Sequence, residues 1–239
     1  MIDLTLSSKF RTHYQKEYPY PHIVIDNFLH PQTLEKAWIE MENFEYFGYD
    51  GTTYSAEHQV NKFFTPWCDE NINDIRLAAP TTYFLMEYFN SPEFINFIEK
   101  LTGIYQLIPD NTWFGGAVHK IERGGKLDIH ADYTKHRFID MYRRLTMLIY
   151  MNKVWDLKWG GNLELWDKKM ENRVKEIEPI FNRMVLFNVT NDSYHGHPKP
   201  MECPPNTSRY SFSICYFTKN KPVEIKEELS AVWRQVPKI

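Results

Sequence analysis

The sequence changes character near residue 104, and this change limits the possible folds more than any other feature of the chain. Beyond that point, short runs typical of β-strands alternate with turns, and Gly124-Gly125 and Gly160-Gly161 separate several of these runs. Many short strands joined by turns are typical of a β-sandwich or barrel. The predicted strands cover residues 114–121, 127–132, 145–151, 162–167, 173–178, 183–189 and 209–218.

The residues before 104 have mainly helical patterns. Leu34, Trp38 and Met41 recur at helical spacing and predict an amphipathic helix. A later helix is marked by Ser91 as a favourable N-cap and by Gly103 at its end. The expected helices cover about 31–44, 78–90 and 92–102, with a short strand over 22–25 and a long irregular segment over 46–70.

Helices first and strands afterwards predict a mainly β, α+β protein in which N-terminal helices buttress a sandwich or barrel. The length of 239 residues is enough for one substantial domain. No boundary is expected at 104, because the apolar faces of the helices need the sheet to cover them. We therefore expect one domain over 1–239, with helical support and a strand in 1–104, the β core in 105–220 and a tail in 221–239.

Composition and charge narrow the functional classes. A net charge of -3 gives no support for a nucleic-acid partner, which usually needs a concentrated basic face. The pairs Arg143-Arg144 and Lys168-Lys169 are expected on the solvated surface. No apolar stretch is long enough to span a membrane. Three cysteines without a CxxC pair, and an N-terminus unlike a signal peptide, predict a reducing compartment and a cytoplasmic location.

The first motif with chemical meaning is His130-Ala131-Asp132. Residues two apart on a strand point to the same face, so this imidazole and carboxylate can reach one metal ion together. With 9 His and 31 Asp and Glu residues, chance supplies about one such pair. Taken alone, a simple His–Asp hydrogen bond is the better interpretation.

The second motif is Ser193-Tyr194-His195-Gly196-His197-Pro198, which begins 61 residues beyond Asp132 (193 − 132). It supplies a distal histidine, either His195 or His197. Two histidines and one carboxylate on one face of a metal leave the opposite positions open. That donor set suits iron(II) and oxygen chemistry, because a co-substrate and dioxygen both need coordination sites.

The third motif is Arg209-Tyr210-Ser211, at the start of a strand that alternates regularly. Arg209 lies on the same face as small polar residues, while aromatic and aliphatic residues lie on the other. A buried guanidinium needs an anion as its partner. A dicarboxylate ligand is one candidate, and an ordinary ion pair with a nearby Glu is the alternative.

These motifs occur together in one order: HxD, an apolar strand ending in Tyr150, a GG turn, SYHGHP and RxS. In this respect the chain resembles the 2-oxoglutarate/iron(II) dioxygenase superfamily, and most of all its branch of prolyl hydroxylases, both oxygen-sensing and ribosomal-protein types. The resemblance covers roughly residues 113–218 and, more weakly, HIVIDNF near the N-terminus. It rests on HKIERGGKLDIHADY, RRLTMLIYMNKVWDLKWGGNLELWD, IEPIFNRMVLFNVTNDSYHGHP and TSRYSFSICYFT.

The resemblance implies a double-stranded β-helix, or jelly roll, with residues 105–220 as its core. It implies that His130, Asp132 and His195 hold iron(II), with His197 as a rival to His195. Arg209 then pairs with the far carboxylate of 2-oxoglutarate. Further residues are expected to bind that carboxylate or to face the site: Ser211, Tyr150, His119 and, with less support, Arg143 and Arg144.

The implied activity is hydroxylation of an unactivated C–H bond with iron(II), 2-oxoglutarate and dioxygen, and ascorbate is a further candidate cofactor. The presence of Asp132 predicts hydroxylation, since halogenating relatives have a small residue there. A prolyl residue of a protein is the leading substrate, and a free amino acid or small metabolite is the alternative. Other metal chemistry, or a non-catalytic jelly-roll binding module, also stays open. Segments 46–70 and 133–143 are expected to shape the substrate choice.

Overall fold

The fold is built on a curled antiparallel sheet. The computed structural model describes residues 7–44, 57–64, 72–113 and 116–236. Its helices are α1 (Ser7–Lys16), α2 (Pro31–Glu42), α3 (Ile72–Ala78), α4 (Pro80–Phe89), α5 (Pro92–Thr102) and the 3₁₀ helix η2 (Leu157–Trp159). Its strands are β1 (His22–Ile25), β2 (Gln59–Phe64), β3 (Ile108–Pro109), β4 (Ala117–Ala131), β5 (Tyr142–Tyr150), β6 (Leu163–Trp166), β7 (Arg173–Ile177), β8 (Met184–Asn188), β9 (His195–His197), β10 (Arg209–Thr218) and β11 (Val232–Trp233).

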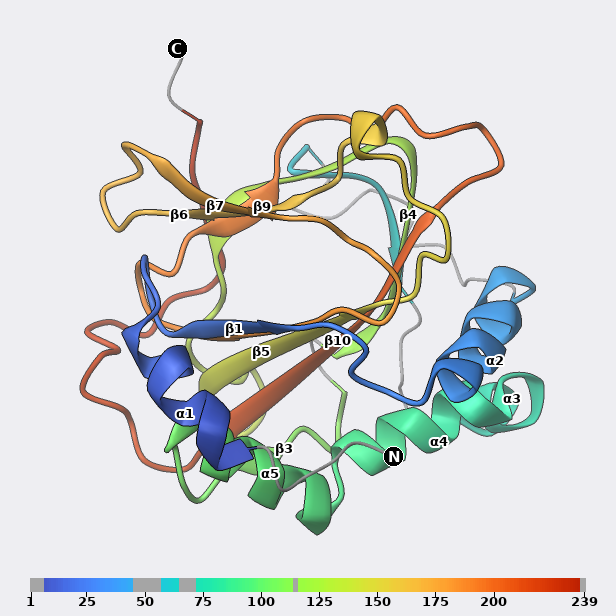
Figure 1. Ribbon diagram of the computed structural model, residues 1–239. Helices are drawn as coiled ribbons and strands as arrows, with labels where there is room; N and C mark the ends of the chain where they lie inside the picture. Colours follow the sequence, from blue (N-terminus) through green and yellow to red (C-terminus); the bar gives the residue numbers. More distant parts are fainter. Residues whose placement is uncertain (1–6, 45–56, 65–71, 114–115, 237–239) are drawn as a thin grey trace.

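The sheet folds over into two facing layers. The strand order is β1-β8-β5-β10-β4-β9-β6-β7, with β2 and β11 added to β4 and β3 added to β10. Figure 1 shows β1, β5 and β10 in one layer and β6, β7 and β9 in the other. The long strand β4 joins the layers, because it pairs with β10 through its first part and with β9 near its end. This jelly-roll-like arrangement confirms the expected fold class.

The strand β4 runs through Gly124-Gly125, so the turn predicted there is wrong. Gly124 has φ +76°, and a Cβ on Gly125 would lie 2.7 Å from the carbonyl oxygen of Glu122. The register of β4 against β2 also shifts at this point, between Val60 and Lys62. The glycine pair therefore lets one strand bend from one layer to the other, whereas glycine in such a pattern usually ends a strand.

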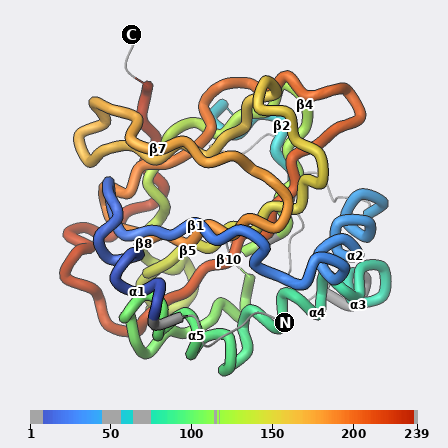
Figure 2. Tube along the Cα trace, in the orientation of Figure 1, coloured from blue at the N-terminus to red at the C-terminus, as the bar shows by residue number. Residues whose placement is uncertain are grey.

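The helices cover the outer face of the β1-β8-β5-β10 layer, as Figures 1 and 2 show for α1, α4 and α5. The rings of Phe89 in α4 and Phe212 in β10 lie 5.7 Å apart, and the hydroxyl of Tyr216 donates to the carbonyl of Phe89 at 2.9 Å. The predicted ends of α5 are confirmed, because Ser91 accepts from the amide of Phe94 and Gly103 has φ +77°. Apolar residues of the helices and strands thus form one core outside the barrel interior.

The segment 46–70, expected to be irregular, contains the strand β2. Gln59–Phe64 pairs with β4 across its bend, so tertiary pairing rather than local pattern forms this strand. The other residues of that segment, apart from 57 and 58, lie outside the described ranges, and so does Cys68. The short elements α1, α3, β3, β9 and β11 were also not predicted, since few of their residues carry a pattern.

Two further findings concern the surface and the cysteines. No helix in the described part of the chain is both long and apolar enough to cross a membrane. Cys203 and Cys215 form no disulfide among the described residues, and both are buried. Lys168 lies on the surface as expected, with 61% of its side chain exposed.

Candidate active site

Three metal-ligating side chains meet in the barrel interior. His130 lies next to the last residue of β4, Asp132 follows that strand, and His195 begins β9 directly opposite His130. One ligand atom of each residue lies within 4.8 Å of the other two. The Nε2 atoms of His130 and His195 are 3.6 and 3.7 Å from the carboxylate oxygens of Asp132. We call these three residues the metal triad.

The backbone fixes how both imidazoles face the triad. Nδ1 of His130 lies 2.9 Å from the carbonyl oxygen of Asp128, and Nδ1 of His195 lies 3.0 Å from that of Ser193. A carbonyl only accepts, so each Nδ1 carries the proton and each Nε2 offers a lone pair toward Asp132. Burial, together with the neighbouring His130, lowers the pKa of His195 to about 4. His195 is therefore a neutral imidazole, the form that binds a metal.

Asp132 is held ionised by two side chains of β5. The hydroxyl of Thr146 donates to Oδ2 of Asp132 at 2.9 Å, and Nη2 of Arg143 lies 3.0 Å from the same oxygen. Arg143 also donates to Thr146 at 2.8 Å. Burial alone would raise the pKa of Asp132, but the neighbouring charge of Arg143 is the largest opposing effect and helps to hold that pKa well below its ordinary value.

The surface placement expected for Arg143 is wrong, because this residue is only 4% exposed. The pairing of β5 with β10 shifts register between Leu145 and Arg143, and this irregularity brings Arg143 to the interior face of Thr146 while Arg144 points away from it. Arg144 lies 3.9 Å from Glu224 instead. Of these two candidates, only Arg143 is part of the site.

A second polar group, Tyr150, Arg209 and Ser211, lies in the same interior, and we call it the anchor cluster. The guanidinium of Arg209 donates to the carbonyl of Gly161 at 2.8 Å and to the hydroxyl of Tyr150 at 3.2 Å, and it lies over the Tyr150 ring. Arg209 is 4% exposed, and among the described residues no carboxylate pairs with it. The alternative of an ordinary ion pair with a Glu is therefore not found in this part of the chain.

Ser211, like Arg209, is a buried polar residue that lacks a matching partner within the described part of the protein. It lies between Tyr150 of β5 and His119 of β4 in the pairing register. Its hydroxyl oxygen is buried and has no hydrogen-bond partner among the described residues. A buried polar atom without a partner costs free energy, which a bound ligand recovers. The anchor cluster thus combines an uncompensated positive charge with a free hydroxyl group.

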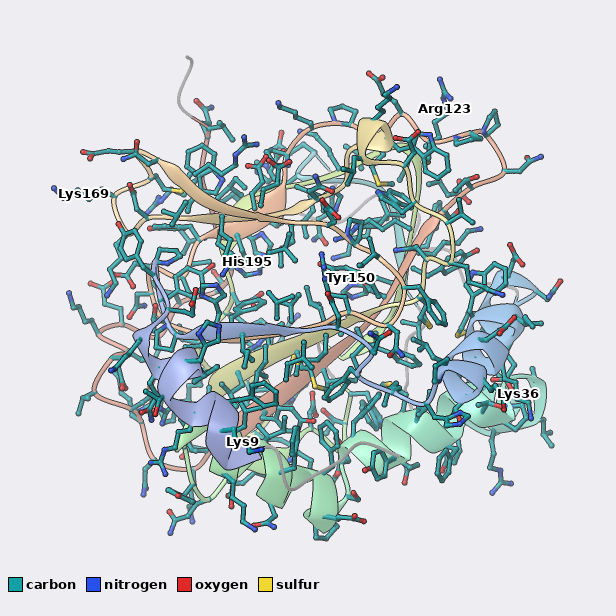
Figure 3. The ribbon with its side chains drawn as sticks, viewed as in Figure 1. Lys9, Lys36, Arg123, Tyr150, Lys169 and His195 are labelled. Atoms are coloured by element: carbon teal, nitrogen blue, oxygen red, sulfur yellow. The ribbon has the colours of Figure 1, made fainter. Side chains whose placement is uncertain are left out.

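Figure 3 places the labelled side chains of His195 and Tyr150 between the two layers, one from each layer. Phe187 lies close to both residues. Its ring is 4.6 Å from that of His195, and it belongs to the same apolar cluster as Tyr150. His119 faces this interior too. Burial and the charges of Lys62 and Arg209 lower its pKa well below the ordinary value.

Sequence reasoning missed Lys62 and Thr146. Lys62 of β2 is paired with Ile121 of β4, which is in turn paired with Arg209. Burial lowers the pKa of Lys62 to about 8, and its ammonium donates to the side chain of Gln59 at 2.9 Å. Lys62 could not be found because its segment has no clear strand pattern. Thr146 could have been found, because it lies an even number of residues from Tyr150 on the same strand and therefore on the same face.

The donor set fits iron(II). Two neutral imidazole nitrogens and one carboxylate oxygen on one side of a metal form the facial triad of non-haem iron(II) oxygenases, with positions left open on the other side. Arg209 and Ser211 fit the far carboxylate of a dicarboxylate co-substrate. Fold and site together define an oxygenase of the jelly-roll class.

Comparison with known proteins agrees with this class. Residues 116–217 match the sequence profile of the 2OG-Fe(II) oxygenase superfamily. Over this stretch the chain is 2OG-Fe(II) oxygenase-like, and in sequence and fold it is similar to prolyl hydroxylases. The expected iron(II) and 2-oxoglutarate are thereby confirmed, with the metal triad intact. Ascorbate stays a prediction.

Similar proteins include several prolyl hydroxylases. Prolyl hydroxylase EGLN3 of Mus musculus is 28% identical over 94 residues, which are 39% of this chain and 37% of that protein, so the match spans little more than a third of the relative. A prolyl hydroxylase of Trichoplax adhaerens, in complex with a hypoxia inducible factor oxygen degradation domain peptide fragment, has a TM-score of 0.61 at 20% identity over 89% of each chain. A prolyl 4-hydroxylase structure from Phytophthora capsici has a TM-score of 0.62 at 18% identity over 95% of this chain and 68% of that one.

Proposed function

We propose that this chain is a hydroxylase that depends on iron(II), 2-oxoglutarate and dioxygen, and that it acts on a prolyl residue of a protein. The observation that carries the proposal is the presence of two complementary groups in one interior. The metal triad offers three ligand atoms, and the anchor cluster offers a buried cation that no described carboxylate neutralises. A dicarboxylate that binds the metal at one end satisfies both.

Each residue has a definite task in this scheme. When bound, iron(II) and 2-oxoglutarate supply the activation of dioxygen needed to oxidise a C–H bond. The carbonyls of Asp128 and Ser193 orient the two imidazoles. Thr146 and Arg143 hold the carboxylate of Asp132 ionised and fixed in position.

Arg209 holds the far end of the co-substrate. Its guanidinium is fixed by Gly161 and Tyr150, which leaves the remaining N–H groups free to donate to a carboxylate. The presence of Asp132 favours an alcohol as the product rather than a halogenated compound.

The choice of a prolyl residue rests on likeness and on one surface feature. EGLN3 is named as a prolyl hydroxylase, and the Trichoplax protein is in complex with a peptide fragment. In this chain, the loop just beyond Asp132 carries two exposed apolar side chains, Phe138 at 71% and Ile139 at 40%. Exposed apolar residues beside a site suit contact with a polypeptide.

Substrate and cofactor use are tested together in one experiment. The protein is incubated with iron(II), 2-oxoglutarate and isotopically labelled dioxygen, and with either proline-containing peptides or a panel of free amino acids. We expect succinate release coupled to the gain of one labelled oxygen atom on a prolyl residue, and loss of both in the Asp132→Ala variant.

Three results would change the proposal. An oxygen atom gained only by a free amino acid would replace the substrate and keep the reaction. Incorporation of added chloride or bromide would refute hydroxylation as the outcome. The absence of any iron-dependent consumption of 2-oxoglutarate, with or without substrates, would refute the proposed function itself.

Two wider expectations remain proposals. We propose that residues 1–239 form a single dioxygenase domain, which is supported by the packing of the helices on the β5-β10 face. The cytoplasmic location predicted from the cysteines stays a prediction; among the described residues Cys203 and Cys215 form no disulfide, which suits a reducing compartment.

A further inference from the structure

His197 is a buried polar side chain for which the scheme above gives no role. It ends β9, two residues after the metal ligand His195, so both side chains point to the same interior face. His197 is 2% exposed, and neither of its ring nitrogens has a hydrogen-bond partner among the described residues. An imidazole always has at least one N–H donor, so this burial leaves donor capacity unused.

Strand pairing along β4 places His197 between the two halves of the site, because β4 pairs with His195 at His130, with His197 at Leu127 and with Arg209 at Ile121. Burial and the positive charges of Arg209 and Lys62 lower the pKa of His197 well below its ordinary value, and His130 and His119 act in the same direction. His130 belongs to the metal triad and Arg209 to the anchor cluster. A dicarboxylate that reaches from the metal to Arg209 therefore passes beside His197.

The unsatisfied atoms gather along this path. The buried polar atoms without partners include both ring nitrogens of His197 and the hydroxyl oxygen of Ser211. Each such atom is destabilising when it stays buried and unpaired. Three of them in one interior, beside the guanidinium of Arg209, indicate that this interior is built to bind a polar ligand.

Lys62 adds a second uncompensated cation to the same interior. Among the described residues its ammonium donates only to the neutral side chain of Gln59. Lys62 is paired with Ile121 of β4, which is also paired with Arg209, so Lys62 lies on the side of the site that holds the anchor cluster. The site thus carries more positive charge than Asp132 balances, and this surplus favours a doubly charged anion.

We propose that His197 binds 2-oxoglutarate directly, by donating a hydrogen bond from a ring nitrogen to a carboxylate oxygen, and that Lys62 supplies a second positive charge to the same co-substrate. The inference rests on the proposed function, because it assumes that 2-oxoglutarate occupies this interior. It also separates the roles of two histidines: His195 binds the metal and His197 binds the co-substrate.

The test measures binding, so it needs no turnover. Protein loaded with Mn(II), which takes the place of the oxidisable iron(II), is titrated calorimetrically with 2-oxoglutarate. We compare the unmodified chain with His197→Leu, His197→Gln, Lys62→Met and Arg209→Ala. The matched control is His22→Gln, because His22 is also fully buried and also has a ring nitrogen without a hydrogen-bond partner, yet its charged neighbours are Glu17, Lys175 and His13 rather than site residues.

We expect His197→Leu to weaken 2-oxoglutarate binding by about 10- to 100-fold, as for a lost hydrogen bond to a charged group. His197→Gln should recover part of the loss, since its amide donates as well. Lys62→Met should also weaken binding, and His22→Gln should not. The affinity for Mn(II) should stay unchanged in both His197 variants, which a metal ligand would not allow.

The possible failures are distinguishable. If the unmodified chain binds neither Mn(II) nor 2-oxoglutarate, the proposed function is wrong and this inference with it. If Arg209→Ala weakens binding while both His197 variants bind 2-oxoglutarate normally, only the inference is wrong. If His197→Gln loses Mn(II) as strongly as His195→Ala does, His197 is a metal ligand and the inference is overturned. Should His197→Leu not fold, the His197→Gln and Lys62→Met measurements still decide.

Discussion

The metal triad and the anchor cluster lie in one barrel interior, but they differ in how their polar atoms are satisfied. In the triad, both Nδ1 atoms have backbone carbonyl partners, and the carboxylate of Asp132 has Thr146 and Arg143. In the anchor cluster, Arg209 has only neutral partners and the hydroxyl of Ser211 has none among the described residues. One half of the site is thus complete in its supporting contacts, and the other is not.

This difference suggests two kinds of preorganisation. A metal ligand must be oriented before the ion arrives, so its outer hydrogen bonds are formed within the protein. An anion site instead keeps its donors free, because any internal carboxylate would compete with the ligand. We therefore expect substitutions in the triad to affect metal binding first, and substitutions in the anchor cluster to affect 2-oxoglutarate first.

The largest effect is expected for loss of a triad ligand. His130→Ala or Asp132→Ala should abolish iron(II) binding and leave the fold largely intact, because the large apolar core lies outside the barrel interior and includes neither residue. Metal titration together with thermal unfolding checks both parts. Iron-dependent turnover at the normal rate in either variant would show that the ligand assignment is wrong.

The next effect is expected in the anchor cluster. Arg209→Ala removes one partner of a buried charged contact, which typically costs on the order of 2–5 kcal/mol in binding. Arg209→Lys should recover part of this, because the ammonium keeps the charge and loses the planar fork. Titration with 2-oxoglutarate measures the change, and metal affinity should stay the same. Unchanged 2-oxoglutarate affinity in Arg209→Ala would place the anion elsewhere.

A smaller effect is expected for the support of the triad. Thr146→Val keeps the shape of the side chain but removes the hydrogen bond to Asp132, and loss of such an outer contact typically lowers metal affinity by about 10- to 100-fold. Thr82→Val is a matched control, since the hydroxyl of Thr82 is also buried and bonded, but in α4. Equal metal affinities in the two variants would argue against a supporting role for Thr146.

Sequence motifs were sufficient for the parts of the site that depend on local spacing. The spacing of two in HxD, SYHGHP and RxS placed the candidate side chains on one face of a strand, and the family resemblance then selected His195 over His197 and assigned Arg209 to the co-substrate. They could not place Lys62 or Arg143. Lys62 reaches the site only through the pairing of β2 with β4, and Arg143 was assigned to the surface because its pairing with Asp132 is a tertiary contact.

The same limit applies to the fold. The alternating runs predicted most strands and a sandwich or barrel, the family resemblance implied the jelly roll, and the caps of α5 were recognisable from Ser91 and Gly103. The bend in β4 was predicted as a turn, because a GG pair looks the same in the sequence whether it ends a strand or bends one. Only the partners on both sides of β4 show that the strand continues.

The smallest effect is expected outside both halves of the site. Ser91→Ala removes the N-cap of α5 and should lower the free energy of unfolding by about 1 kcal/mol. Chemical denaturation measures this change, and neither iron(II) nor 2-oxoglutarate affinity should follow it. A weakened site in this variant would show that the helices and the barrel interior are coupled more strongly than the contacts indicate.

The most direct test of the account is the dependence of 2-oxoglutarate binding on both halves of the site. The unmodified chain is titrated with 2-oxoglutarate under anaerobic conditions, with and without iron(II), and the same titrations are made with Arg209→Ala. The account predicts strong binding only when iron(II) and Arg209 are both present, and weaker binding when either is missing. Binding that is equally strong without iron(II), or no binding under any condition, would contradict it.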